Sequence, residues 1–364
     1  METTYPSFGN FSIESLDSNI TYVRPNIGGN VHLIYNQIIL PILTYVPPIL
    51  LTLGMISDSL ALVVLRQSNL RQCSIGFYLR VFIVIDIFVR ILKPALEWII
   101  TYCKLTHIPH ISDPLCRLWQ FGWNVLYSSA TWLAVCMVVD RYIILWHSRK
   151  ATERCNVFMS KVAIAMVFTG LVVINIHAMW SAYFTSGLCN QINPNNPKMH
   201  ELVWFWVSMS ANYYIPLILL LFFDIAVVLG IIIKGDRSNY FGQLATEEYE
   251  MTSVSTVICI TFFLITSPEH ICYLLEENLQ LRGHGLILLF LTSTAAQLLT
   301  LFNSVLVFIF CILFSSSFRS TLIEIFVNIF RRKLSHSEYE LATANNNMEG
   351  TALEIDNPTH NASN

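Results

Sequence analysis

The chain has 364 residues, of which 54% are hydrophobic, 13% aromatic and only 12% charged. A soluble domain of this length does not need so much apolar sequence, so the composition indicates an integral membrane protein. The formal net charge of -3 argues against the basic surface that neutralises phosphates, and we expect no nucleic acid as a partner.

The polar segment 1–37 lacks the basic start, apolar run and cleavage site of a signal peptide, so we expect the first span to act as signal anchor. It contains the glycosylation sequons Asn10-Phe11-Ser12 and Asn19-Ile20-Thr21. Because such sequons are modified only on the lumenal side, Asn10 and Asn19 predict an extracellular N-terminus.

Seven apolar runs follow, each long enough to cross about 30 Å of hydrocarbon. They cover residues 39–65, 75–101, 115–145, 160–184, 203–234, 251–275 and 286–314. Four charged residues interrupt the second run, which we expect to form one helix with a polar inner face. The predicted fold is therefore all-α, a bundle of seven transmembrane helices spanning 38–314.

The distribution of basic residues gives the same orientation. With the N-terminus outside, 14 of the 21 Lys and Arg residues fall on the inner loops and tail. This is the side on which short loops retain basic residues. We therefore expect a multi-pass plasma-membrane protein with a cytoplasmic C-terminus.

The last segments read as cytoplasmic. Residues 315–333 place apolar side chains on one helical face and predict an amphipathic helix on the inner leaflet. The tail 334–364 is too polar to fold, and its hydroxyl residues are candidate phosphorylation sites for recruiting arrestin.

The third run has distinctive residues at both ends, with Cys116 at its start and Asp140-Arg141-Tyr142 at its end. We expect Cys116 to pair with Cys189 in the long loop after the fourth run, because both lie on the oxidising side. The alternatives are two unpaired thiols, or competition from Cys103 or Cys272.

Together, these features resemble the rhodopsin-like (class A) G-protein-coupled receptors over residues 39–333. The matching landmarks are Asp140-Arg141-Tyr142, Asp86, Pro216, Phe262 with Pro268, and Asn303. The stretch Asn303 to Arg319 and the DRYI run are most similar to nematode Srw chemoreceptors and FMRFamide-type neuropeptide receptors. The resemblance implies a receptor that binds an extracellular ligand and activates a heterotrimeric G protein.

The resemblance also implies a switch at the cytoplasmic end. We expect Arg141 to contact Glu248 at rest, and its release to let the sixth helix swing out about Pro268. The alternative is that Glu247, Glu248 and Glu250 form a solvated acidic start of that helix.

Two carboxylates in mid-membrane, Asp58 and Asp86, are expected to lie together near Asn303 and to line a polar cavity. In related receptors the second-span acid can bind sodium, so this pair is a weak candidate ion site. The spacing of the nine cysteines indicates no structural metal site, and no cofactor is expected.

For the ligand, the sequence argues against two classes. Trp123 stands where amine receptors place an Asp, and Gln297 stands where opsins place the retinal Lys. We expect instead a charged, aromatic cavity for a peptide or chemosensory molecule, with Arg90 and Lys93 receiving an anion. The candidate ligand-binding residues are Arg90, Lys93, Glu97, Trp119, Trp123, Tyr213, Glu269, His270 and Gln297.

The residues allow other interpretations. Lys93 and Glu97 can be a simple i, i+4 pair, Arg90 can bond Glu269, and the tryptophans can be an interfacial belt. Ser304 and Thr266 depart from the family pattern and put the usual activation mechanism in doubt. The alternative class is a seven-span channel or transporter. We do not expect an enzyme.

Overall fold

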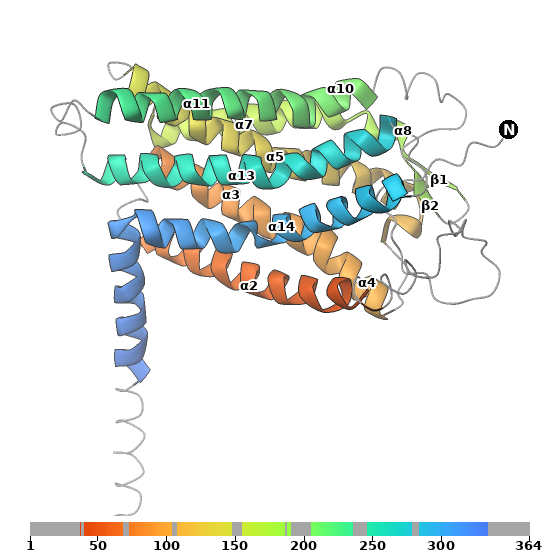
Figure 1. Cartoon of the computed structure of the whole chain (residues 1–364), viewed down its shortest axis with the longest axis horizontal. Coiled ribbons are helices and arrows are strands. Elements are labelled where there is room, and N and C mark those ends of the chain that lie inside the picture. Colours follow the sequence, from red (N-terminus) through yellow and green to blue (C-terminus); the bar gives the residue numbers. More distant parts are fainter. Residues whose placement is uncertain are drawn as a thin grey trace, which may run out of the picture.

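The structure is a computed structural model that describes residues 37, 40–67, 73–103, 108–147, 155–185, 188–190, 205–235, 246–278 and 284–333. The glycosylation candidates Asn10 and Asn19 and the tail 334–364 lie outside these residues. Within them, almost all of the chain is helical, and the long helices lie side by side in one bundle (Figure 1).

The described helices follow one another along the chain with few other elements. The α-helices are α2 (Leu40–Gln67), α3 (Ser74–Arg90), α4 (Leu96–Cys103), α5 (Asp113–Trp146), α7 (Val157–Asn175), α8 (Ala178–Ser181), α10 (Phe205–Met209), α11 (Ile215–Gly235), α13 (Thr246–Asn278) and α14 (His284–Phe314). The helical part also contains the π-helical turns η3 (Ile91–Ala95) and η6 (Ser210–Tyr214), the 3-10 turn η4 (Ile108–His110) and a helix over residues 316–333.

Within the described part of the chain, six helical segments are long and apolar enough to cross a membrane. They are Pro41–Gln67, Asp113–Trp146, Val157–Ser181, Trp206–Ile233, Glu250–Cys272 and Leu291–Phe314. These segments indicate a multi-pass helical membrane protein. The path from α3 through η3 to α4 is not among the six, so the expected count of seven spans stays a prediction.

Prolines explain the interruptions of two predicted helices. The run expected at 75–101 is not one α-helix, because the π turn Ile91–Ala95 separates α3 from α4 and contains Pro94. A proline has no N–H and its ring clashes with the carbonyl four residues earlier, and a wider turn relieves both problems. A second π turn, Ser210–Tyr214, lies just before Pro216.

The fourth run ends earlier than expected. The prediction of helix to residue 184 is wrong, because α7 and the short α8 are followed by strand β1 (Tyr183–Thr185), which pairs antiparallel with β2 (Leu188–Asn190). The resulting hairpin lies at the end of the bundle where α4, α8 and α10 also lie (Figure 1). We call this the hairpin end.

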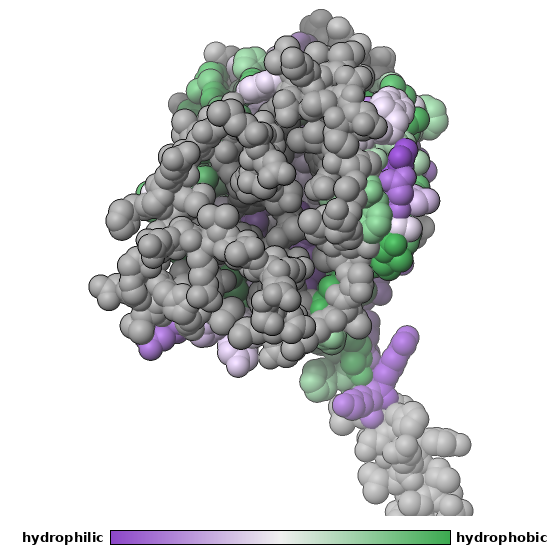
Figure 2. Space-filling model, turned by 90° about the vertical axis from the view of Figure 1, so that its right-hand side faces the viewer, coloured by the Kyte–Doolittle hydropathy of each residue, from purple (hydrophilic) through white to green (hydrophobic). Residues whose placement is uncertain are grey.

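The main apolar core is built by the long helices. It includes the edge-to-face pair Phe82 and Phe262, whose ring centroids are 5.6 Å apart. Large apolar side chains also face outward, among them Ile218 (66% exposed) and Phe222 (62%) on α11. Hydrophobic side chains are visible on the flank of the bundle in Figure 2. An apolar exterior of this extent fits contact with lipid.

Residues 316–333 form the predicted helix after α14, and this helix runs across the bundle axis (Figure 1). Its start is fixed by Glu250, whose carboxylate accepts hydrogen bonds from the Ser316 backbone N–H (2.8 Å) and hydroxyl (2.7 Å). Phe318 is fully buried, whereas Phe326 and Phe330 are exposed. The helix packs on the bundle through its first half, where Leu322 and Ile325 also contact the core, and presents apolar side chains beyond it.

Candidate ligand and switch sites

Polar side chains enter the bundle at three levels. We call them the Glu269 cluster (Tyr127, Tyr213, Glu269, His270, Thr300), the Arg90 cluster (Asp58, Asp86, Arg90, Ser304) and the Arg141 cluster (Ser74, Asp140, Arg141, Thr252). Along α5 and α3 they follow one another from the hairpin end to the opposite end. Viewed from the hairpin end, hydrophilic side chains show in the interior between the surrounding segments (Figure 2).

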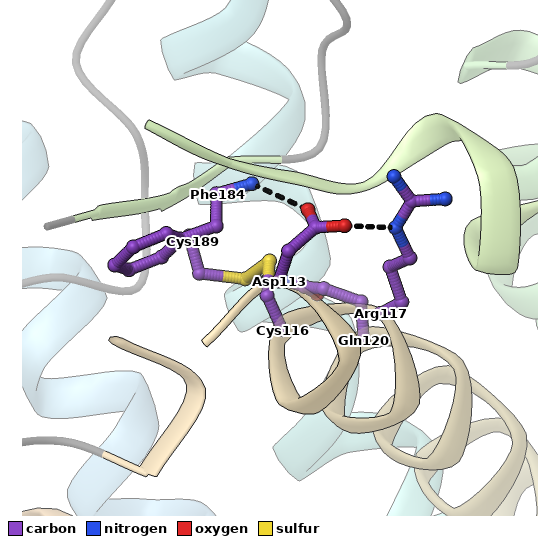
Figure 3. Close-up of a disulfide and its surroundings, with 6 residues drawn as sticks. All are labelled: Asp113, Cys116, Arg117, Gln120, Phe184 and Cys189. Atoms are coloured by element: carbon purple, nitrogen blue, oxygen red, sulfur yellow. Dashed lines mark hydrogen bonds and ion pairs between the residues drawn. A yellow bond between two sulfur atoms is a disulfide. The ribbon is translucent and has the colours of Figure 1, made fainter. Parts of the chain in front are cut away.

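The hairpin is attached to the first turn of α5 (Figure 3). The predicted disulfide is present and joins Cys116 of α5 to Cys189 of β2, with 5.4 Å between the Cα atoms. Asp113 accepts a hydrogen bond from the Phe184 backbone N–H (3.0 Å) and pairs with Arg117 (2.8 Å). The disulfide and the Asp113 bond thus hold both strands against the same helix.

The Glu269 cluster combines one carboxylate with three rings. The Glu269 Oε2 atom accepts hydrogen bonds from the Tyr127 hydroxyl (3.1 Å) and the Thr300 hydroxyl (3.2 Å). The rings of Tyr213 and His270 are 4.4 Å apart between centroids, and Tyr127 lies 5.8 Å from Tyr213 and 6.0 Å from His270. Helices α5, α13 and α14 and the turn η6 supply these side chains, so the cluster joins four elements.

The other predicted ligand residues lie around this cluster with different exposure. The Lys93 ammonium is 4.8 Å from the centroid of the Trp123 ring, which in turn lies 5.3 Å from that of Tyr127. Glu97 and Trp119 are partly buried, and Gln297 is exposed on α14. The structure therefore brings Lys93, Trp123, Tyr213, Glu269 and His270 into one connected group.

Arg90 lies elsewhere, at the centre of its own cluster. Its side chain is 3% exposed, its Nη2 atom lies 2.9 Å from Asp86 Oδ2, and its Nε atom lies 3.8 Å from Asp58 Oδ2. Its Nη1 atom donates to the Leu301 carbonyl at 2.5 Å. Gly54 leaves the space for this arrangement, because a Cβ atom there would come within 2.7 Å of Nη1.

This arrangement changes two predictions. Arg90 was expected to receive a ligand anion or to bond Glu269, but its guanidinium is directed at Asp86, Asp58 and the Leu301 carbonyl. The two carboxylates were a candidate sodium site, and the protein itself supplies a cation beside them. Ser304 completes the cluster, since its hydroxyl lies 2.7 Å from Asp58 and 2.5 Å from Asp86.

The Arg141 cluster joins three helices at the end opposite the hairpin. The Ser74 hydroxyl of α3 donates to Asp140 (2.9 Å) and accepts from Arg141 Nη2 (3.2 Å), which also bonds Asp140. Arg141 Nη1 donates to the Thr252 hydroxyl of α13 at 3.4 Å. Both Asp140 and Arg141 are buried.

The contact expected between Arg141 and Glu248 stays a prediction. The described contact from Arg141 to α13 goes to Thr252, one turn beyond Glu248, and the Glu248 side chain lies outside the described residues. Tyr142 packs edge-on against Phe223 of α11, with 5.2 Å between centroids. The Asp-Arg-Tyr triplet thus faces three neighbouring helices.

The remaining switch residues are placed within α13 and α14. Pro268 lies inside α13, which continues through it. Asn303 is buried, and among the described residues its Oδ1 atom has no hydrogen-bond partner. The same holds for Oδ1 of the buried Asp224 on α11.

Sequence reasoning missed several partners of the candidate residues. The missed side chains are Ser74, Tyr127, Thr252, Thr300 and, as a ligand of both carboxylates, Ser304. One signal was available, because Asp86 and Arg90 are four residues apart and so lie on one helical face. The hydroxyl partners have no such signal, since Ser and Thr are common in apolar helices and commonly bond their own backbone.

In the part of the chain that the structure describes, no group of three or more His, Cys, Asp or Glu side chains lies close enough to hold a metal ion. No protein-family model matches this chain, and no curated protein matches it.

Proposed function

We propose that this protein is a rhodopsin-like G-protein-coupled receptor of the plasma membrane. It senses an extracellular peptide or chemosensory molecule and activates a heterotrimeric G protein. In this proposal the path α3, η3 and α4 is one more span, second in chain order, which brings the six apolar segments to seven. Its charged residues Arg90 and Lys93 face inward, to Asp58 and Trp123. The hairpin end is extracellular, and helix 316–333 lies on the cytoplasmic leaflet, from which the tail recruits arrestin.

The observation that carries the proposal is the Arg141 cluster. Arg141 is fixed on one side by Asp140 and Ser74, and among the described side chains of α13 it bonds Thr252, at a long 3.4 Å. A weak contact at the end of a long helix can be broken without disturbing the core. Its loss would free the cytoplasmic end of α13 to move about Pro268 and open a surface for the G protein.

The test is guanine-nucleotide exchange by purified G proteins on membranes that contain the receptor, without added ligand. Thr252→Val removes the Arg141 partner at nearly constant volume. A hydrogen bond to a charged group contributes about 1–2 kcal/mol, so we expect basal exchange to rise by about fivefold.

The matched control is Thr256→Val, the same change one turn along α13, where the hydroxyl bonds only the Thr252 carbonyl (2.7 Å). It should leave basal exchange unchanged. If Thr252→Val and Thr256→Val behave alike, Arg141 is not the lock. If no variant promotes exchange and the membranes pass an ionic current or a solute, the channel or transporter alternative holds.

A further inference from the structure

The Glu269 carboxylate lies in the hairpin half of the bundle and has no ion-pair partner among the described residues. We propose that the Glu269 cluster binds an organic cation, a ligand ammonium that pairs with Glu269 between the rings of Tyr127, Tyr213 and His270. This inference rests on the proposed function only for the side from which a ligand enters. It reverses the sign of the ligand charge expected from the sequence.

The first step is that the two neighbouring cations, Arg90 and Lys93, have partners other than Glu269. Arg90 is neutralised by Asp58 and Asp86 within the bundle. Lys93 lies against the face of Trp123. Among the described residues, no Lys, Arg or His nitrogen lies within 4.0 Å of the Glu269 carboxylate. A carboxylate inside a helix bundle needs a counter-charge, and a ligand can supply it.

The second step is that Glu269 keeps an oxygen for a ligand. The Tyr127 and Thr300 hydroxyls both donate to Oε2. These bonds hold the carboxylate in one orientation. Within the described part of the chain, Oε1 has no hydrogen-bond partner. An ammonium group has three donors and forms short, strong hydrogen bonds to a carboxylate oxygen that is already positioned.

The third step is the group of three aromatic rings beside the Glu269 carboxylate. Tyr127, Tyr213 and His270 contact one another in pairs, at 4.4 to 6.0 Å between centroids. Aromatic faces attract cations, and more strongly where water is excluded. They also cover the apolar body of an organic cation, which a hydrated metal ion does not have.

A fourth observation is a buried polar atom in the same cluster. His270 is 9% exposed, and its Nε2 atom is buried without a hydrogen-bond partner among the described residues. Buried polar atoms are rarely left unpaired, so Nε2 is suited to meet a polar atom of the ligand. The ligand class is therefore an ammonium group with an apolar body and one neighbouring polar atom.

The test uses three probes that share one apolar body and differ in charge: 2-phenylethylamine, 2-phenylethanol and phenylacetate. Each is added to the purified full-length protein, and the midpoint of thermal unfolding is followed, since a ligand that binds only the folded state raises it. We expect the cation to raise the midpoint at the lowest concentration, and phenylacetate to have no effect. Phenylalaninamide, which carries its ammonium on a peptide backbone, distinguishes a peptide terminus from a small amine.

Variants locate the effect. Glu269→Gln should raise the concentration of 2-phenylethylamine for half of the maximal shift by at least tenfold. Tyr127→Phe keeps the ring but removes one of the two bonds that orient the carboxylate, so it should raise this concentration by less than Glu269→Gln does. Glu324→Gln makes the same charge change on the exposed helix 316–333 and should leave it unaltered.

The proposal is overturned if phenylacetate stabilises the protein more than 2-phenylethylamine, if all three probes act equally, or if Glu269→Gln retains the wild-type response. Because these measurements contain no G protein, they stand apart from the proposed function. A protein that binds the cation and never promotes nucleotide exchange would refute the receptor and leave the site. Exchange that responds to ligands, together with a Glu269→Gln variant that binds the cation as the wild type does, would support the receptor and refute the site.

Discussion

The Arg90 and Glu269 clusters are built from similar parts and differ in how their charges are matched. Both place carboxylates between helices and attach a hydroxyl from α14 to them, Ser304 in one case and Thr300 in the other. In the Arg90 cluster the opposing cation comes from the protein and is 3% exposed. In the Glu269 cluster the carboxylate has hydroxyl partners and aromatic neighbours, and none of the described cations pairs with it.

The difference separates a structural site from a site that is open to a ligand. A buried ion pair whose bonds are all made inside the protein stabilises one packing of the helices, and it is damaging to break. A carboxylate that keeps one oxygen unbonded can still form a hydrogen bond or an ion pair with a ligand. Removing a group from the Arg90 cluster should therefore cost more stability than removing one from the Glu269 cluster.

The largest effect is expected for Arg90→Gln. The substitution leaves Asp58 and Asp86 close together without their cation, and breaking a buried pair in this way costs about 3–5 kcal/mol. We expect a large fall in the thermal midpoint and in surface expression. Lys93→Gln, one turn along the same path, removes an equal charge from a cation–π contact and should cost about 1 kcal/mol or less.

A second substitution strengthens this prediction. Asp58→Asn in the Arg90→Gln background removes one of the two stranded charges and should recover part of the lost stability. An Arg90→Gln protein as stable as Lys93→Gln would remove the contrast between the clusters.

An intermediate effect is expected for Gly54→Ala. The new Cβ atom would lie 2.7 Å from Arg90 Nη1, and Arg90 is held by its bonds to Asp86 and Leu301. Overpacking of this kind costs about 1–3 kcal/mol in the free energy of unfolding. Gly122→Ala is the control, because nothing lies within 4 Å of its Cβ position, and the higher helix propensity of alanine should make it neutral or slightly stabilising.

The smallest effect concerns the two α14 hydroxyls. Ser304→Ala removes a hydroxyl that lies against both carboxylates of the Arg90 cluster, and we expect a cost of about 2 kcal/mol. Thr300→Val removes one of two bonds to Glu269 and should cost about 1 kcal/mol or less. Thermal unfolding of both variants with and without 2-phenylethylamine checks this, and equal costs would mean that the clusters are equally closed.

The sequence predicts the helical elements well because their signal is local. Runs of apolar residues long enough to cross a membrane need no partner to be recognised, and six of them are found as long apolar helices. The pairing of Cys116 with Cys189 was also predicted, from the expectation that both lie on the oxidising side of the membrane. The breaks at Pro94 and before Pro216 depend on how the chain relieves a clash, which the run of apolar residues hides.

The site residues were predicted as a set, but their partners were not. Arg90, Lys93 and Glu269 stood out as charges in apolar sequence, yet the sequence does not say which way a long side chain turns. Arg90 reaches one turn back to Asp86, and the small Gly54 on α2 leaves room for its guanidinium to reach the Leu301 carbonyl as well. The hairpin was not predicted because Tyr183 and Phe184 continue an apolar run, which reads as more of the preceding helix.

The Asp86–Arg90 pair also bears on how the protein is made. Under the proposed topology, α3 has to leave the translocation machinery for the bilayer, although a single charged side chain at the centre of a helix opposes insertion by about 2.5–3.5 kcal/mol. Asp86 and Arg90 are one turn apart on the same helix, so they can neutralise each other without a partner from another helix. The earlier helix α2 then offers Asp58 as a second anion, so the two helices are suited to enter the membrane together as a hairpin.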